Sequence, residues 1–238
     1  MKPILQRLLR AAAWGAAALA AQSAGATVLA FDSVAVGPVT QDQRWHEAGY
    51  TLSGHTVDPL ALPGDLVGMV ADGSDPGVCV NLMCPPNPGH YYQGLNDGVL
   101  IVAADRPGAA FRLQAFDASF IGAVPGAAYP ALAGKLGIYG AYADGSYAYE
   151  EYALDGPGPG GFQFQHYLAS AGFAAQPFVE LDLMAWSCDA GGTCVSFTDG
   201  QGQFALDNVA VAAIPEPASW TMLGLGVLLL AASRRRQA

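Results

Sequence analysis

Turn-forming residues interrupt this chain so often that no long regular element fits between them. Glycine contributes 30 of the 238 residues and proline 16. Between these breaks lie short runs in which apolar and polar residues alternate, the period of a strand with one face in water. About nine such runs follow at intervals near ten residues, which is typical of a sandwich. We expect an all-β, antiparallel β-sandwich of jelly-roll-like form, with strands within residues 27–36, 49–57, 99–104, 110–123, 134–154 (a hairpin), 162–169, 178–186 and 202–211.

One long stretch departs from this rhythm. Residues 71–98 hold four prolines and five glycines, too many for regular structure over that length. Loops this long in a compact domain are usually functional or cross-linked. This one contains Cys79 and Cys84, so we expect a loop closed by a disulfide.

The first 26 residues have the form of a secretory signal peptide. Lys2, Arg7 and Arg10 precede the apolar run Ala11–Ala21, and Ala24-Gly25-Ala26 supplies the small residues of a cleavage site. The alternative is a buried N-terminal helix, but the basic start and the small residues at the end fit export better. We expect cleavage after Ala26.

The four cysteines all follow the signal peptide. An even number of cysteines in an exported chain implies disulfides, and three pairings are possible. Cys79–Cys84 and Cys188–Cys194 are favoured, because each pair closes a short loop rich in turn residues. Zinc is the competing interpretation, but neither spacing is C-x-x-C and no histidine is close in sequence to either pair.

Charge excludes one class of partner. Residues 27–214 contain four Lys or Arg and nineteen Asp or Glu, a formal net charge of −15. Nucleic acid is therefore not expected as a partner, because phosphate binding needs basic side chains. The acidity serves solubility in one interpretation and cation binding in the other, since Ca²⁺ prefers carboxylate ligands.

Two carboxylates are unusual because they share parity with apolar strand positions. Asp207 alternates with Ala205, Val209 and Val211, and Asp32 has the parity of Val34 and Val36. A buried carboxylate needs a partner. Either each accepts hydrogen bonds from a nearby turn or backbone, or the first and last strands pair and the two acids help to hold a structural Ca²⁺. Jelly-roll carbohydrate-binding modules resemble the second arrangement, with a cation near their paired termini.

No catalytic motif is present in the sequence. The nucleophile elbow, the H-E-x-x-H zinc motif, the phosphate-binding loop and the dinucleotide fingerprint are all missing. Glu150 and Glu151 are adjacent, so on a strand they point to opposite faces and do not form an acid–base pair. The histidines share no ligand spacing: His46, His55, His90 and His166. We expect a protein that is not an enzyme, with a polysaccharide hydrolase as the alternative.

Tyrosines are frequent, and they permit two interpretations. They either fill sheet faces and cross-strand pairs, or form a platform on which sugar rings stack. The residues concerned are Tyr91, Tyr92, Tyr139, Tyr142, Tyr147, Tyr149 and Tyr152.

The C-terminal segment carries the most specific pattern. Pro215-Glu216-Pro217 is followed by the uncharged stretch Ala218–Ser233 and then by Arg234, Arg235 and Arg236. The prolines prevent helix continuation and keep Glu216 in an extended segment. The uncharged stretch has sixteen residues, slightly below the usual spanning range of about 17–25. The arginines are expected to stay cytoplasmic.

This pattern resembles the PEP-CTERM sorting signal, in which a membrane-embedded exosortase recognises and processes the tail. Ile214 stands where the commonest form has valine, a conservative difference. The resemblance implies a Gram-negative bacterium that makes extracellular polysaccharide, and a precursor held in the inner membrane before it reaches the cell surface or the medium. A core helix would not end in three arginines, and a permanent anchor would not explain Pro-Glu-Pro.

A second, shorter resemblance lies just before the tail. Gln203, Phe204 and Asp207 match the Gln-Phe-x-x-Asp motif by which one group of PEP-CTERM proteins is named. No activity follows from this motif. Its residues are expected to be structural, with Phe204 in the core and Asp207 as a buried polar anchor.

The predicted organisation is a signal peptide (1–26), a β-sandwich domain (27–212) and a sorting signal with one transmembrane helix (213–238). The expected function is that of an exported, exosortase-processed, non-catalytic surface or extracellular-matrix protein, associated with exopolysaccharide or biofilm. The alternatives are a carbohydrate-binding module with a structural Ca²⁺, and a polysaccharide hydrolase. The expected partners are exosortase, the inner membrane during processing, and exopolysaccharide.

Overall fold

The computed structural model of the chain describes residues 25–58, 60–75, 77–198 and 200–214. Within them, Ala26–Ala213 form one compact unit. The predicted signal peptide and sorting signal lie outside the described residues, apart from residues 25–26 and 213–214. In the part of the chain that is described, no helix is long and apolar enough to cross a membrane.

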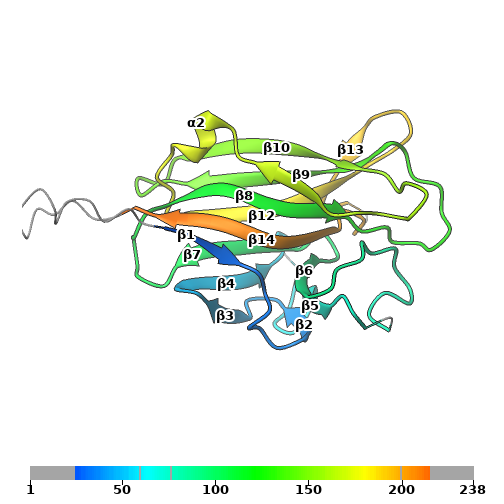
Figure 1. Cartoon of the computed structure of the whole chain (residues 1–238), viewed down its shortest axis with the longest axis horizontal. Helices are drawn as coiled ribbons and strands as arrows, with labels where there is room; N and C mark the ends of the chain where they lie inside the picture. Colours follow the sequence, from blue (N-terminus) through cyan, green and yellow to red (C-terminus); the bar gives the residue numbers. More distant parts are fainter. Residues whose placement is uncertain (1–24, 59, 76, 199, 215–238) are drawn as a thin grey trace, which may run out of the picture. The chain divides into compact units, whose positions relative to one another are not determined.

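Two antiparallel sheets make up the unit, which confirms the predicted β-sandwich (Figure 1). The strands of sheet A follow the order β11 (Gln165–Leu168), β8 (Phe111–Phe120), β14 (Phe204–Ala213), β6 (His90–Gly94), β5 (Leu66–Asp72) and β2 (Gly37–Thr40). In addition, β1 (Ala26–Leu29) pairs with β14. A short helix, α2 (Ala171–Ala174), follows β11.

Sheet B is the second layer. Its order is β10 (Tyr147–Asp155), β9 (Leu132–Ala141), β12 (Glu180–Cys188), β7 (Val99–Ala104), β4 (Tyr50–His55) and β3 (Arg44–Glu47), and β13 (Cys194–Val195) pairs with β12. The predicted hairpin is β9 and β10, joined at Asp144-Gly145, where Gly145 has a φ of +84°. Asp144 accepts hydrogen bonds from the backbone and side chain of Ser146, which stabilises this turn.

The core lies between the inner faces of the two sheets. Alternate residues of β12 on one side and β8 on the other are fully buried, as expected for strands with one face in a core. Each such side chain contributes about 1.5–3 kcal/mol through the hydrophobic effect. The core residues on these and neighbouring strands include Leu52, Leu100, Val102, Phe111, Leu113, Leu136, Ile138, Leu181, Leu183 and Phe204.

The first and last strands pair, with Ala26 opposite Ala212 and Leu29 opposite Val209. The predicted first strand is too long, however. The backbone leaves the extended conformation at Phe31, whose φ is +59°, and Asp32 lies exposed in the turn that follows. The parity that placed Asp32 beside Val34 and Val36 on an apolar face therefore does not apply.

A β-bulge corrects the predicted face of Asp207. The register of β14 shifts after Asp207, and Asn208 has a φ of +50°. A bulge inserts one residue and so reverses which face the following side chains occupy. Asp207 consequently lies on the outer face of sheet A with Ala205, whereas Val209 and Val211 point into the core.

The predicted long loop 71–98 is interrupted by β6, but the rest of it covers the outer face of sheet A. Val78, Leu82 and Cys84 pack on a small apolar cluster that includes Tyr91 and Ala205. Both favoured disulfides are present: Cys79–Cys84 cross-links this loop, and Cys188–Cys194 joins the β12–β13 turn. Sheet A is therefore buried on both faces at this point.

Candidate functional site

The outer face of sheet B presents aromatic rings to solvent. Tyr147 and Tyr149 alternate with inward-pointing residues along β10, and they are 68% and 40% exposed. Tyr139 lies directly opposite Tyr149 on β9. Trp186 of β12 has the same orientation, because its neighbour Ala185 points into the core. We call these four residues the ring row.

The four rings contact one another across three strands. The centroids of Tyr139 and Tyr149 are 4.5 Å apart, and those of Tyr139 and Tyr147 are 5.7 Å apart. Trp186 meets Tyr149 edge-on at 6.2 Å. Such pairs stabilise each other by about 0.5–1.5 kcal/mol beyond the area they bury. The ring row is therefore a pre-formed aromatic surface.

A glycine makes room for the indole ring. An added Cβ at Gly137 would lie 2.2 Å from Cζ3 of Trp186 and 2.9 Å from Cε2 of Tyr149. The rings thus lie directly over the backbone of β9, at a position where any side chain would displace them. In the sequence this residue belongs to the run Gly134–Gly140, which reads only as a strand with several glycines.

One edge of the ring row is held by an ion pair. Lys135 donates to Oε1 of Glu151, and the hydroxyl of Tyr149 donates to Oε2 at 2.9 Å. The hydrogen bond from Lys135 lowers the pKa of Glu151. Burial, followed by the bond to Glu151, raises the pKa of Tyr149. Because Lys135 and Glu151 are largely solvated, the pair orients Tyr149 more than it stabilises the fold.

Asp182 lies beside the ring row on β12. Its neighbours across the strands are Tyr139 on β9 and Ile101 on β7. Oδ1 is buried and has no hydrogen-bond partner among the described residues. Burial, with a smaller contribution from Glu180, raises the pKa of Asp182 from 3.8 to about 6, and His55 opposes the shift.

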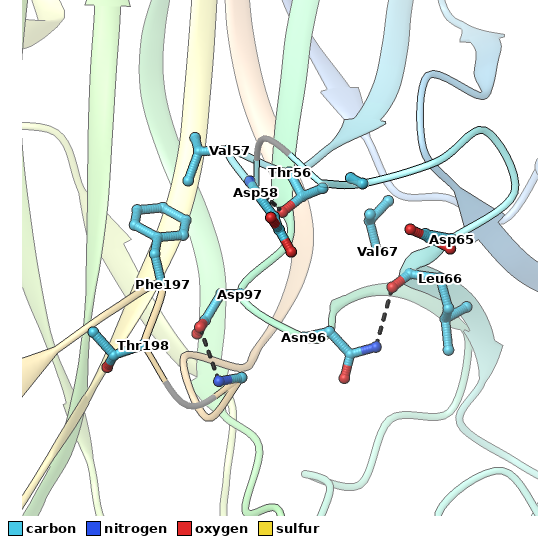
Figure 2. A pocket seen from close by; sticks show the side chains of 12 residues that line it. Thr56, Val57, Asp58, Asp65, Leu66, Val67, Asn96, Asp97, Phe197 and Thr198 are labelled. Carbon is cyan, nitrogen blue, oxygen red and sulfur yellow. Dashed lines mark hydrogen bonds between the residues drawn. The ribbon is translucent and has the colours of Figure 1, made fainter.

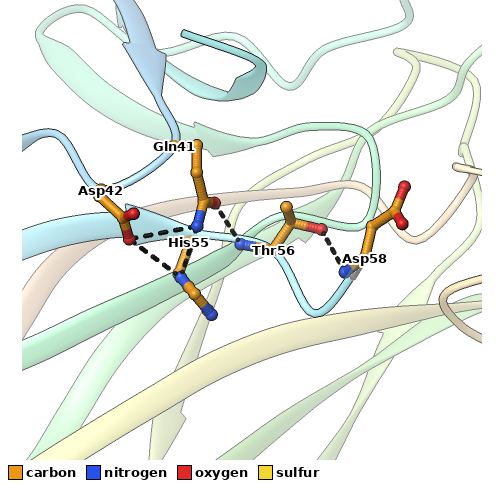
Figure 3. A network of polar contacts seen from close by, with 5 residues as sticks. All are labelled: Gln41, Asp42, His55, Thr56 and Asp58. Atoms are coloured by element: carbon orange, nitrogen blue, oxygen red, sulfur yellow. Dashed lines mark hydrogen bonds and ion pairs between the residues drawn. The ribbon is translucent and has the colours of Figure 1, made fainter. Parts of the chain in front are cut away.

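His55 is held by a polar network at the end of β4, which Figure 3 shows. Gln41 Oε1 accepts the backbone N–H of Thr56 at 2.9 Å, which fixes the orientation of the amide. The Nε2 of Gln41 therefore donates to Nδ1 of His55, 2.9 Å away. Asp42 Oδ1 accepts the other N–H of the amide at 3.1 Å and lies 3.3 Å from Nδ1 of His55, so the amide and the carboxylate both contact the ring.

A pocket of about 590 Å³ opens at one end of the unit, among the β4–β5, β6–β7 and β13–β14 loops (Figure 2). Its carboxylates already hold backbone groups. Asp97 accepts from Gly200 and Gly202, Asp65 from Leu62, and Asp58 from Leu60. The pocket's acids therefore shape loops, and its exposed apolar surface is provided mainly by Val57, Leu66 and Phe197.

The other predicted aromatic and basic residues take structural positions. Tyr91, Tyr92 and Tyr152 are buried, and Tyr142 packs on Phe178. The histidines bond separately, His46 to Asp105 and His166 to Asp117. Over the ranges that the structure describes, no group of three or more His, Cys, Asp or Glu residues is placed to hold a metal ion.

The predicted calcium ligands meet hydrogen-bond donors. Asp207 is buried, and its oxygens accept from Asn87 Nδ2 at 2.8 Å and from the backbone N–H of Asn208 at 2.7 Å. Asp32 accepts the backbone N–H of His90 at 3.0 Å. One N–H group bonds each oxygen of Asp207 and one oxygen of Asp32, as the hydrogen-bonding alternative expects, and a Ca²⁺ ion at this pair stays a prediction. Burial raises the pKa of Asp207, and the bond from Asn87 opposes this.

The Gln-Phe-x-x-Asp residues have the predicted structural positions. Phe204 is fully buried, and its ring fills the space beside Gly94, where an added Cβ would lie 2.2 Å from Cε1. Gln203 is buried and donates to the carbonyl of Gly200 at 3.2 Å.

Sequence reasoning missed Trp186 and Asp182 as site residues. A signal for both was present, since assigning Leu181, Leu183 and Ala185 to the core face of β12 places Asp182 and Trp186 on the opposite face. It also missed the buried acids Asp97 and Glu47, which hold loops; Glu47 accepts the backbone N–H of Phe31 at 3.0 Å. The predicted sorting residues lie outside the described part of the chain: Pro215, Glu216, Pro217, Arg234, Arg235 and Arg236.

Comparison with known proteins supports the sorting signal. Residues 213–236 match the model of the PEP-CTERM protein-sorting motif. No curated protein matches the chain.

Several solved structures are similar to the chain at low identity and low TM-score. A mutant of the family 29 carbohydrate-binding module CBM29-2 is 13% identical with a TM-score of 0.34, over 75% of this chain and 91% of that one. A DUF4465 family protein from Bacteroides ovatus is 9% identical with a TM-score of 0.42, over 78% and 98%. TmCBM61 in complex with β-1,4-galactotriose is 8% identical with a TM-score of 0.31, over 71% and 90%. Likeness at this level transfers no ligand.

Proposed function

We propose that this chain, a PEP-CTERM protein, is a non-catalytic polysaccharide-binding protein of the cell surface or extracellular matrix, and that the ring row is its binding surface. The sorting motif indicates an exported protein that is held transiently in a membrane and processed by an exosortase. The association with exopolysaccharide or biofilm, in a Gram-negative bacterium, is our proposal for what the exported domain does.

The ring row is the observation that carries this proposal. Sugar rings present flat arrays of C–H groups that stack on aromatic faces, and Tyr and Trp combine such a face with a polar group. Tyr147 and Tyr149 are exposed, and their contacts with Tyr139 and Trp186 fix them before any ligand arrives. Pre-organisation of this kind lowers the entropic cost of binding.

The other surfaces offer less. The loop that carries Cys79–Cys84 covers the outer face of sheet A around Ala205. In the end pocket the carboxylates hold backbone groups, and its exposed ring, Phe197, belongs to the β13–β14 loop and not to the strands that carry the ring row. A long polysaccharide also fits an open sheet face better than a pocket between loops.

The carboxylates near the ring row support a binding role. A glycosidase places two carboxyl groups facing each other across the scissile bond. Here Glu151 is engaged by Lys135 and Tyr149, and Glu180 and Asp182 lie side by side on one strand.

Affinity electrophoresis of the full-length protein, purified in mild detergent, tests the proposal. The gels contain single soluble polysaccharides that are neutral, acidic or amine-bearing. We expect at least one to retard the native protein, and the Tyr147→Ala/Tyr149→Ala variant to lose most of that retardation. Phe197→Ala is the matched control, because it removes an exposed ring elsewhere. If both variants bind like the native protein, the ring row is not the site.

A hydrolase is the second candidate, because Asp182 has a pKa of about 6, which suits a general acid. Incubation with the same polysaccharides, followed by a reducing-end assay, decides between the two. Turnover that Asp182→Asn abolishes would establish the enzyme and overturn the non-catalytic proposal.

A further inference from the structure

Asp182 belongs to a line of residues that crosses the outer face of sheet B. The register places Tyr149 opposite Tyr139, Tyr139 opposite Asp182, and Asp182 opposite Ile101. A ligand lying along the ring row therefore passes next to this carboxylate. The side chains on both sides of it are a tyrosine ring and an isoleucine, which explains why it is largely shielded from water.

One oxygen of the Asp182 carboxylate has lost solvent without gaining a donor. Oδ1 is buried, and no described residue donates a hydrogen bond to it. A partly buried carboxylate in this state is costly, because the charged form is stabilised neither by water nor by a protein donor. A ligand with a cationic N–H donor would remove that cost on binding.

The protein itself supplies little positive charge at this position. Lys135 is engaged by Glu151. His55 of β4 is already contacted by the amide of Gln41 and by the carboxylate of Asp42. Glu180, on the same face of β12, adds a second negative charge. Ile101 of β7 has no charge. Its neighbour on β4 is Ser53, and the neighbour of Ser53 on β3 is Arg44, so Arg44 is three strands away from Asp182.

We propose that the ring row binds a polysaccharide whose sugars carry free amino groups, with one ammonium group placed between the carboxylate of Asp182 and the ring of Tyr139. This inference rests on the proposed polysaccharide-binding function and names its ligand class. The carboxylate supplies an ion pair that is partly shielded from water, and the adjacent ring supplies a cation–π contact.

The net charge of the whole unit also favours an amine-bearing polysaccharide. Residues 27–214 have a formal net charge of −15, so an acidic polysaccharide would be repelled at every approach. A neutral polysaccharide would leave Asp182 without a counter-charge. An amine-bearing chain is attracted at long range and paired at short range.

The test compares two ligands that differ only at nitrogen. The probes are the β-1,4-linked hexasaccharides of glucosamine and of N-acetylglucosamine, titrated calorimetrically into the full-length protein at about pH 6.5, where an Asp182 carboxylate paired with an ammonium stays charged. We expect the native protein to prefer the glucosamine hexasaccharide roughly tenfold, as for one close charge pair. Asp182→Asn should lose this preference and keep its affinity for the N-acetylated hexasaccharide.

Two further variants separate the possible failures. Glu180→Gln changes the neighbouring carboxylate and should keep the preference; an equal loss in both variants would show a general electrostatic effect and overturn the assignment to Asp182. Tyr149→Ala should weaken binding of both hexasaccharides. Equal binding of the two probes by the native protein overturns the amine proposal, as does binding of neither. The polysaccharide gels still decide the broader function.

Discussion

At the scale of single residues, the carboxyl group of Asp182 links the binding surface to folding stability. Its pKa rises from 3.8 to about 6 in the folded protein because burial disfavours the charged form. Between these values the folded protein holds the proton more tightly than the unfolded chain does, so the stability falls as the pH rises. Above about pH 6 the penalty is fully present.

Asp182→Asn should therefore stabilise the native fold at neutral pH. We expect the free energy of unfolding to increase by about 1–2 kcal/mol at about pH 7.5, after discounting the shift for partial exposure. At about pH 4 the native carboxyl is protonated, and the variant should differ little from it. Urea unfolding at both pH values measures this. An equal effect at the two values would mean that the charge of Asp182 is not responsible.

Gly137 provides a second prediction about a single residue. Gly137→Ala should displace Trp186, because the new methyl group would lie 2.2 Å from its ring. We expect weaker polysaccharide retention, measured by affinity electrophoresis, and an intact fold, checked by circular dichroism. Gly158→Ala is the control, since an added Cβ there meets nothing within 4 Å. Unchanged retention in Gly137→Ala would show that the position of the indole ring is unimportant.

At the scale of elements, the bond between Asn87 and Asp207 attaches the disulfide-closed loop to sheet A. Asn87→Ala removes a donor from a buried carboxylate and should cost about 1–3 kcal/mol. Denaturant unfolding measures the loss. Gln163→Ala, which removes an exposed side-chain bond to Gly160, is the control and should cost much less. Equal costs for the two variants would contradict the anchoring role of Asn87.

The elements that the sequence predicted well are the long ones. Strands β8, β9 and β12 have nine or ten residues each, and their ends lie within a few residues of the prediction. The four-residue strands β2 and β3 and the two-residue β13 were missed, as was the seven-residue β5, and β6 was assigned to a loop. β6 is buried on both faces because the disulfide-closed loop packs over Tyr91, so its pattern does not alternate.

Local backbone geometry explains the errors about individual side chains. A strand pattern assumes uninterrupted alternation, which the bulge at Asn208 and the left-handed Phe31 both break. Phe31 gives no sign of its positive φ, whereas Asp207-Asn208 does mark the bulge, because strands disfavour both residue types and Asn readily adopts the left-handed conformation. The same difficulty applies to the tyrosines, because only strand register separates exposed Tyr149 from buried Tyr152.

At the scale of the whole molecule, the candidate site is assembled from strands far apart in the sequence. Tyr149, Tyr139 and Trp186 meet only because β10, β9 and β12 are neighbours in sheet B. The sequence identified the tyrosines as one group but could not say which strands pair. The sorting motif, by contrast, is continuous in the chain and is recognised directly.

The sorting motif leads to a prediction about processing. Replacement of Pro215, Glu216 and Pro217 by alanine should leave the full-length precursor in the membrane fraction of the native host, because the Pro-Glu-Pro part of the sorting motif is lost. In the native protein, mass spectrometry of the mature form should find Arg234–Arg236 removed. Gln237→Ala, outside the matched residues 213–236, should be processed normally. A native mature protein that retains the arginines would contradict processing.

Hydroxyl-radical footprinting of the full-length protein tests the central claim, that the ring row binds polysaccharide, most directly. Oxidation is read by mass spectrometry with and without a saturating polysaccharide from the gel panel. Tyr147 and Tyr149, both exposed, should oxidise in the free protein and be protected by the ligand, while Phe197 in the end pocket should oxidise equally in both. Protection at Phe197 with unchanged oxidation of the two tyrosines would place the polysaccharide elsewhere and contradict the account.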